Sequence, residues 1–117
     1  MLTFFLTPRI VNYANSKAYE LGSLRGSITE GRGNWAGFVG EMLVADYLGA
    51  TLENTYDYDL IIDGIRVDVK AKNTTATPRL DYECSVADFN TKQKCDMYAF
   101  VRVDKEANTA WILSWFL

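Results

Sequence analysis

The chain has 117 residues, of which 49% are hydrophobic and 23% are charged, and its formal net charge is −3. These values are typical of one compact globular domain over 1–117, and the net negative charge argues against nonspecific coating of nucleic acid. The sequence contains no histidine, which excludes His-based catalytic triads, zinc sites with His ligands and imidazole general bases.

The two cysteines and the short apolar segments indicate the cellular compartment of the protein. Cys84 and Cys95 lack the spacing of a metal site and are too few for a disulfide framework, which favours reduced thiols. The opening segment MLTFFL is apolar but short and has no basic n-region. No apolar run approaches the roughly 20 residues that span a bilayer. We therefore expect a cytoplasmic protein without membrane contact.

The first half of the chain predicts a helix and a cationic loop. Thr7 followed by Pro8 is typical of a helix N-terminus and predicts a helix over 8–24. The glycine-rich segment 22–33 follows, and it is either a solvated linker or a loop that contacts substrate. Its two cations are Arg25 and Arg32.

The rest of the chain predicts one more long helix and several strands. Asn34 can cap a helix, WAGFVGEMLVADYLGA, which Gly49 ends. Beyond it we expect a hairpin over 56–72, a strand over 80–86, a short helix or turn over 87–94, and strands over 97–103 and 109–117. This order predicts an α/β (α+β) domain with a mixed, mainly antiparallel sheet of four to five strands flanked by helices.

The hairpin can be given a register from the sequence alone. Asp63-Gly64 between alternating runs predicts a type I′ turn, which needs positive φ at both central residues. Ile62 then pairs with Ile65, and three steps farther from the turn Asp59 stands opposite Asp68 on the charged face. Like charges so placed are destabilising and require a cation, a shared proton or open water. The face is therefore either an ordinary solvated surface or a divalent metal site with oxygen ligands.

Glu41 is a carboxylate on an apolar helix face. Its neighbours at three and four residues are small or apolar: Gly37, Phe38, Val44 and Ala45. A buried carboxylate needs a cation or a hydrogen-bond partner, or else it changes its protonation state. Glu41 therefore either reaches water at the edge of the stripe or joins the hairpin carboxylates as a further ligand.

These residues together resemble the PD-(D/E)XK nuclease superfamily. The matching segments are GEMLVADYLG with Glu41, YDYDLIID with Asp59, and RVDVKAK with Asp68 and Lys70. The resemblance covers residues 33–103, with a catalytic core over 34–103 of restriction-endonuclease-like fold. Two positions depart from the pattern, because Tyr58 replaces the proline of the superfamily name and the strand acid is Asp68 instead of glutamate.

The resemblance implies a magnesium- or manganese-dependent endonuclease that hydrolyses phosphodiester bonds in duplex or branched DNA. Asp59 and Asp68, with the carbonyl of Val69, would hold the metal, and Glu41 would complete its shell or position a water. Lys70 would orient the attacking water and stabilise negative charge. A resolvase-like or restriction-like role in a phage or other mobile element would suit so small a domain. A catalytically silent nucleic-acid-binding or regulatory module of the same fold, and an RNA-directed nuclease, are the alternatives.

Cations outside the hairpin are candidates for substrate contact. They could follow a phosphate backbone or could simply solubilise the protein. The candidates are Arg25, Arg32, Lys72, Arg79, Lys92 and Lys94, and Gln93 is a candidate for a helix residue of the site. The apolar end of the chain, 109–117, is either a homodimer interface or a strand buried in the core.

Overall fold

The computed structural model describes residues 1–25, 35–53, 55, 58–78 and 94–116, with only the backbone of residues 22–25 and 116. The described elements are two helices, α1 (Pro8–Arg25) and α2 (Trp35–Leu48), and the strands β1 (Leu2–Phe5), β2 (Thr51–Leu52), β3 (Leu60–Ile62), β4 (Ile65–Asn73), β5 (Met97–Asp104) and β6 (Thr109–Phe116). The predicted strand 80–86, most of the predicted helix or turn 87–94, and the predicted cap Asn34 lie outside the described residues.

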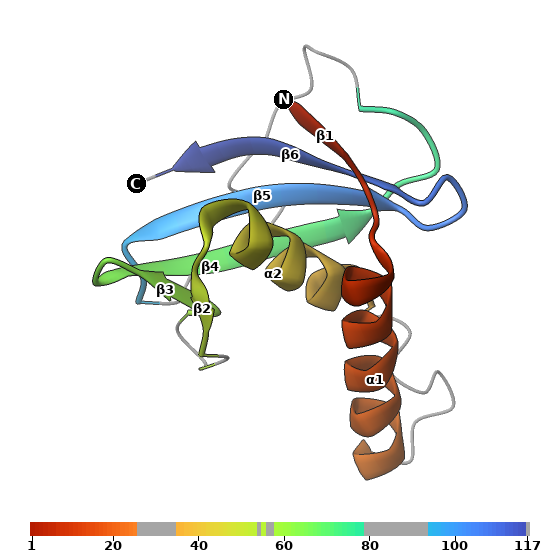
Figure 1. Ribbon diagram of the computed structural model, residues 1–117, viewed down its shortest axis with the longest axis horizontal. Helices are drawn as coiled ribbons and strands as arrows, with labels where there is room; N and C mark the ends of the chain where they lie inside the picture. Colours follow the sequence, from red (N-terminus) through yellow and green to blue (C-terminus); the bar gives the residue numbers. More distant parts are fainter. Residues whose placement is uncertain (26–34, 54, 56–57, 79–93, 117) are drawn as a thin grey trace.

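The strands form one sheet in the order β1-β6-β5-β4-β3-β2 (Figure 1). The β4–β5 pair is parallel and the other described pairs are antiparallel, so the predicted mixed α+β sheet is confirmed. The predicted strand number of four to five is wrong, because the described residues form six strands. The two strands that the sequence did not indicate are the four-residue β1, which pairs with β6, and the two-residue β2, which pairs with β3.

Local sequence signals set the helix ends. The N–H of Ile10 donates to Thr7 Oγ1 at 3.3 Å, as expected when Thr7 caps the helix that Pro8 begins. Helix α1 ends at Arg25, one residue beyond the prediction. After α2, Gly49 has a φ of 68°, and the N–H of Ala50 donates to the carbonyl of Ala45 at 3.0 Å. This left-handed glycine with a six-to-one hydrogen bond is a Schellman end, so Gly49 ends the helix as predicted.

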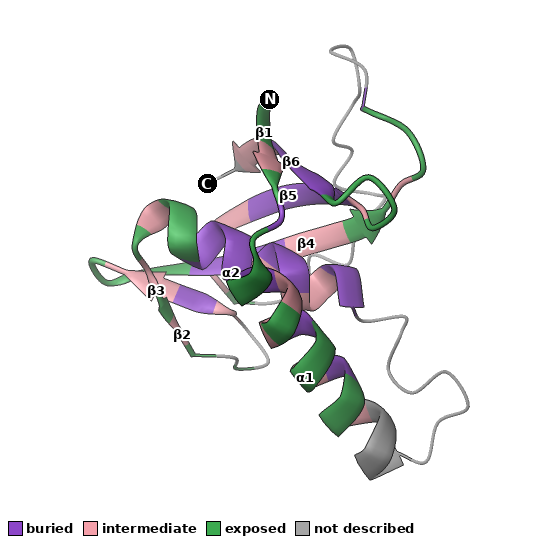
Figure 2. Cartoon of the chain, turned by 45° about the vertical axis from the view of Figure 1, so that its right-hand side comes forward, coloured by how far each residue is buried: buried purple, intermediate pink, exposed green. Residues whose placement is uncertain are grey.

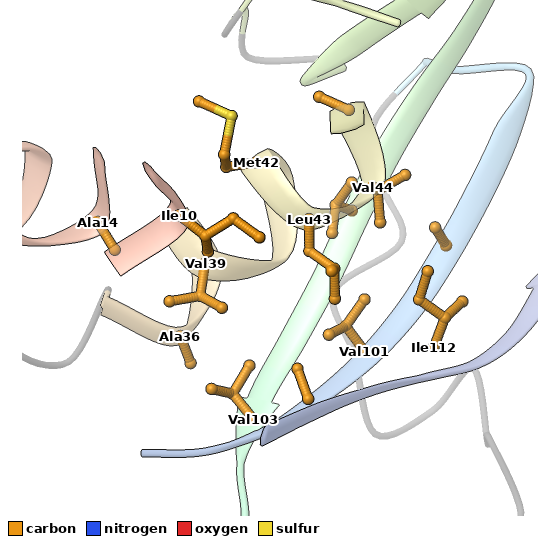
Figure 3. Close-up of a cluster of buried hydrophobic side chains, with 14 of the residues drawn as sticks. Ile10, Ala14, Ala36, Val39, Met42, Leu43, Val44, Val101, Val103 and Ile112 are labelled. Atoms are coloured by element: carbon orange, nitrogen blue, oxygen red, sulfur yellow. The ribbon is translucent and has the colours of Figure 1, made fainter. Parts of the chain in front are cut away.

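Helix α2 lies across one face of the sheet over β4 and β5 and is buried along most of its length (Figures 1 and 2). Figure 3 shows Val39 and Leu43 of α2 pointing toward Val101 and Val103 of β5. Gly40 permits this close approach, because a Cβ added there would lie 3.0 Å from Ala71 Cβ and 3.1 Å from Val69 Cγ1. The contact fixes the height of α2 above the strand that carries Asp68.

The β3–β4 hairpin has the predicted register. Ile62 pairs with Ile65 and Leu60 with Val67, and the turn residues Asp63 and Gly64 have φ values of 50° and 80°. Both values are those of a type I′ turn. Leu60, Val67 and Val69 are buried on the predicted core face. Asp68, on the opposite face, is also buried at 5% exposure, so the charged face of the hairpin is not an ordinary solvated surface at this residue.

A second contact joins the beginnings of the parallel strands β4 and β5. Arg66 Nε and Nη2 donate to Asp96 Oδ2 and Oδ1 at 3.0 and 3.1 Å, and the N–H of Asp96 donates to the carbonyl of Arg66 at 2.9 Å. The N–H of Arg66 also donates to Asp96 Oδ2 at 2.8 Å, and the three bonds that Arg66 donates to the exposed Asp96 carboxyl lower its pKa to about 2. The pair therefore aligns β4 with β5 close to Asp68.

The apolar strand β6 lies inside the sheet between β1 and β5. Trp111 and Ile112 are 3% and 1% exposed, so their apolar character is explained by burial in the core. The homodimer interface predicted for 109–117 is not needed to explain these two residues. Among the described helices, none is both long and apolar enough to cross a membrane.

Candidate functional site

Asp59 is held across the hairpin by backbone and side-chain hydrogen bonds. It directly precedes β3, and its N–H donates to the carbonyl of Val67 at 2.9 Å. Its carboxylate Oδ2 accepts a hydrogen bond from the N–H of Val69 at 2.8 Å. Asp59 is therefore fixed beside β4 by bonds to the two residues that flank Asp68. The described strand register ends at the pair Leu60–Val67, so the predicted pairing of Asp59 with Asp68 stays a prediction.

Asp68 and Lys70 form an ion pair shielded from water. Lys70 Nζ lies 2.8 Å from Asp68 Oδ2, and the two side chains are 14% and 7% exposed. The hairpin thus places a buried carboxylate oxygen of Asp68 directly beside the ammonium group of Lys70.

Glu41 approaches the hairpin from α2. It is half-buried, and the hydroxyl of Tyr13 on α1 donates to its Oε2 at 3.3 Å. Glu41 and Asp59 lie close enough for each to act on the pKa of the other, and so do Asp59 and Asp68. The helix residue and the hairpin pair that the sequence singled out therefore meet in a chain, with Asp59 in the middle.

Burial and mutual repulsion raise the pKa of each carboxyl in this chain. Burial raises the pKa of Asp59 to about 6, and the nearby charge of Glu41 adds to the shift. Burial also raises the pKa of Asp68 to about 6, with the charge of Asp59 adding to the shift and Lys70 opposing it. Burial raises the pKa of Glu41, against hydrogen bonds with Asp59 and Tyr13. Lys70 and Lys17 do not offset three desolvated carboxylates, so the cluster favours a further cation or a proton.

The donor set suits a hard divalent cation, although the side chains do not form a closed cage. Magnesium prefers carboxylate and carbonyl oxygens and usually keeps several waters, so two protein carboxylates are enough to hold it. Asp68 Oδ2 is a buried oxygen that lies beside the ammonium group of Lys70. Within the described part of the chain, however, no group of three or more acidic or cysteine side chains is arranged to hold a metal ion. Glu41 contacts Asp59 and does not join both aspartates at one point.

A cleft of about 320 Å³ opens beside the carboxylates. Its described lining comes from α1, α2 and the segment before β3: Tyr13, Lys17, Phe38, Glu41, Thr55 and Asp59. Tyr13 and Lys17 are not indicated by any motif in the sequence. The two residues are one helical turn apart and so share a face of α1, but only the packing of α1 on α2 brings that face to Glu41.

The predicted substrate-binding cations are less well placed. Lys72 is exposed on β4, two residues beyond Lys70 and on the same face of the strand, and Lys94 is exposed just before β5. Arg25 ends α1, and its side chain is not described. Three other candidates, Arg32, Arg79 and Lys92, lie outside the described residues, as does Gln93. Neither Lys72 nor Lys94 is among the described residues that line the cleft.

No protein-family model matches the chain, and a search of curated proteins finds no significant match.

Proposed function

We propose that this protein is a magnesium- or manganese-dependent nuclease that hydrolyses phosphodiester bonds in duplex or branched DNA. The observation that carries the proposal is the half-buried Asp59 and the buried Asp68, held next to each other by a type I′ hairpin beside Lys70. Two carboxylates that repel each other at a desolvated site lower the stability of the folded protein. Natural proteins keep such clusters mainly where a cation or a reaction uses them. The placement of Asp59, Asp68 and Lys70 supports the proposed resemblance to the PD-(D/E)XK superfamily.

Asp59 and Asp68, with the backbone carbonyl of Val69, would hold the metal. When bound, the metal would acidify a coordinated water and neutralise charge on the phosphate. The raised pKa values of the aspartates agree with this role, because a carboxylate pair without its cation is expected to retain protons to higher pH. The hydrogen bond from the N–H of Val69 keeps Asp59 oriented whether or not the metal is present.

Lys70 supplies the positive charge that the reaction needs near the scissile phosphate. It is on the same strand face as Asp68 and only 14% exposed, so its charge is weakly screened by water. We assign it to orient the attacking water and stabilise negative charge as it develops. Glu41, fixed by Tyr13 and adjacent to Asp59, would accept a proton from water or bind it as an outer ligand.

Cleavage of defined substrates tests the proposal. The protein is incubated with magnesium or manganese and a panel of linear duplex, single-stranded, Holliday-junction and RNA substrates. The variants Asp68→Ala and Lys70→Ala are expected to lose cleavage by at least about 100-fold, since each removes a group that acts in the transition state. The matched control is Asp46→Ala, which removes an exposed carboxylate of α2 that pairs with Arg9.

The possible outcomes separate the alternatives. Cleavage that persists in both site variants would refute the site assignment. If the wild-type protein cuts no substrate and calorimetry detects no magnesium binding, the chain is a catalytically silent binding module. Cleavage confined to the RNA substrate would assign it to the RNA-directed alternative.

A further inference from the structure

The cleft beside Glu41 and Asp59 combines groups that the metal chemistry does not require. Its volume of about 320 Å³ lies at the small end of the range for ligand sites, which suits one nucleotide unit but not a base pair. Besides the two carboxylates, its described lining contains one lysine, Lys17, and two aromatic rings, Tyr13 and Phe38. The lysine suits the phosphate of a nucleotide, and the aromatic rings suit its base. The carboxylates suit a metal ion that accompanies the phosphate.

Lys17 is positioned to bind a phosphate group. It is half-buried, with its Nζ 5.9 Å from the centre of the Tyr13 ring, and it lies close enough to Glu41 for its charge to act on that carboxyl. It also pairs with Glu20 at 3.7 Å, but these side chains are 41% and 63% exposed. Ion pairs of this exposed kind are weak, so a phosphate can replace Glu20 at little cost.

Phe38 and Tyr13 form an aromatic wall. Their ring centres are 6.5 Å apart and the rings are nearly perpendicular at 83°, so the edge of one ring meets the face of the other. Proteins that bind single strands stack bases on such side chains, because every base has an aromatic face. A base inside a continuous duplex is covered by its neighbours and has to leave the stack before it can enter a cleft of this kind.

From this combination, and resting on the nuclease function proposed above, we propose that the cleft binds one unpaired nucleotide of the substrate strand. Lys17 contacts its phosphate and Phe38 packs against its base. The protein then prefers single-stranded or branched DNA, in which such a nucleotide is available, over continuous duplex.

Equilibrium binding tests the proposal independently of cleavage. The probes are a 5′-labelled single-stranded oligonucleotide of mixed sequence and the blunt duplex of the same sequence, followed by fluorescence anisotropy with calcium as the oxygen-binding cation. A denaturing gel confirms that each probe stays intact. The variants are Lys17→Gln and Phe38→Leu. The matched control is Lys105→Gln, since Lys105 also lies over an aromatic ring, that of Trp35 at 4.8 Å, but is not among the described residues of the cleft.

The two cleft variants are expected to weaken single-strand binding in different ways. Lys17→Gln should reduce the slope of log K against log salt by about 0.7, the contribution of one phosphate contact to a single strand. Phe38→Leu should weaken binding by at least about five-fold, the smallest usual effect of losing a stacked base, with the salt slope unchanged. Duplex binding should change less in both variants, and Lys105→Gln should bind both probes as the wild type does.

Unchanged single-strand binding in both cleft variants, with their melting temperatures preserved, would overturn the proposal. Equal losses on single strand and duplex would overturn its choice of an unpaired nucleotide. If Phe38→Leu does not fold, the Lys17→Gln substitution and its salt slope still decide the outcome. Failure of the proposed nuclease function is seen separately, as absence of cleavage in magnesium while binding still depends on Lys17.

Discussion

Replacing Asp59 with asparagine should stabilise the metal-free protein while removing its metal binding. Asp59 lies between Glu41 and Asp68, and its charge opposes both. Asparagine has the same shape, its carbonyl oxygen can still accept the hydrogen bond from the N–H of Val69, and its NH₂ group can donate to a neighbouring carboxylate. The substitution Asp59→Asn therefore removes repulsion without removing the contact that positions the residue.

The magnitude follows from the pKa of Asp59, which burial and Glu41 raise from 3.8 to about 6. A shift of this size corresponds to about 3 kcal/mol of ionisation cost, but Asp59 is only half-buried and water screens part of it. We expect Asp59→Asn to increase the free energy of unfolding by about 1–2 kcal/mol at pH 7.5. The folded state keeps its proton to higher pH than the unfolded state, so the wild type is relatively stable below pH 3.8 and loses this stability as pH rises through about 6.

Urea unfolding between pH 4 and 8, with a chelator present, measures the effect. The wild-type free energy of unfolding should fall between pH 4 and 6, and Asp59→Asn should flatten that fall. The absence of histidine helps, because no imidazole titrates in this range. The matched control is Asp63→Asn in the hairpin turn, where asparagine tolerates the positive φ and should change stability by less than about 0.5 kcal/mol.

Added magnesium should stabilise the wild type and the control variant but not Asp59→Asn, since only a protein that binds the ion gains from it. The reasoning would be refuted if Asp59→Asn were less stable than the wild type at pH 7.5. It would also be refuted if the two proteins showed parallel pH profiles.

Two further substitutions test how the site is supported. Gly40→Ala should lower the free energy of unfolding by about 1–3 kcal/mol by overpacking, because the new methyl group meets side chains of β4 at 3.0 and 3.1 Å. Gly37→Ala, which meets no atom within 4 Å, should instead gain up to about 1 kcal/mol from helix propensity; similar urea midpoints for the two would contradict the packing argument. In the wild type, the bonds from Arg66 to the Asp96 carboxylate supply stability above pH 3.8, and this stability is lost as pH falls through about 2. Asp96→Asn should abolish this pH-dependent contribution. Melting temperatures between pH 2 and 5 measure this, and an acid-induced loss of equal size in the variant would count against it.

The parts of the fold that could be predicted from the sequence depend on local signals. Thr7-Pro8, Gly49 and Asp63-Gly64 each determine the backbone at one place, and the structure has the helix ends and the hairpin turn where they indicate. The hairpin register follows from the turn by counting, and the structure has it from Ile62–Ile65 to Leu60–Val67. The meeting of Glu41 with Asp59 was expected from a carboxylate on an apolar helix face.

The parts that could not be predicted depend on contacts between segments far apart in the sequence. Strand β1 forms because β6 offers it an edge, and nothing within its four residues indicates this. The alternation in β4 assigns Asp68 to a face but does not reveal that this face is covered. Tyr13 and Lys17 reach the site only through the packing of α1 on α2.

The pairing of β1 with β6 also sets the order in which the nascent chain can fold. Leu6 and Asn108, 102 residues apart in sequence, exchange hydrogen bonds at the end of this pairing. At the usual pace of synthesis β1 must wait roughly 5–20 s before its partner strand emerges. During this interval the phenylalanines of β1 have no partner strand. The hairpin with its two aspartates, in contrast, pairs segments that are close in sequence. It can therefore form before the last strand of the sheet has been synthesised.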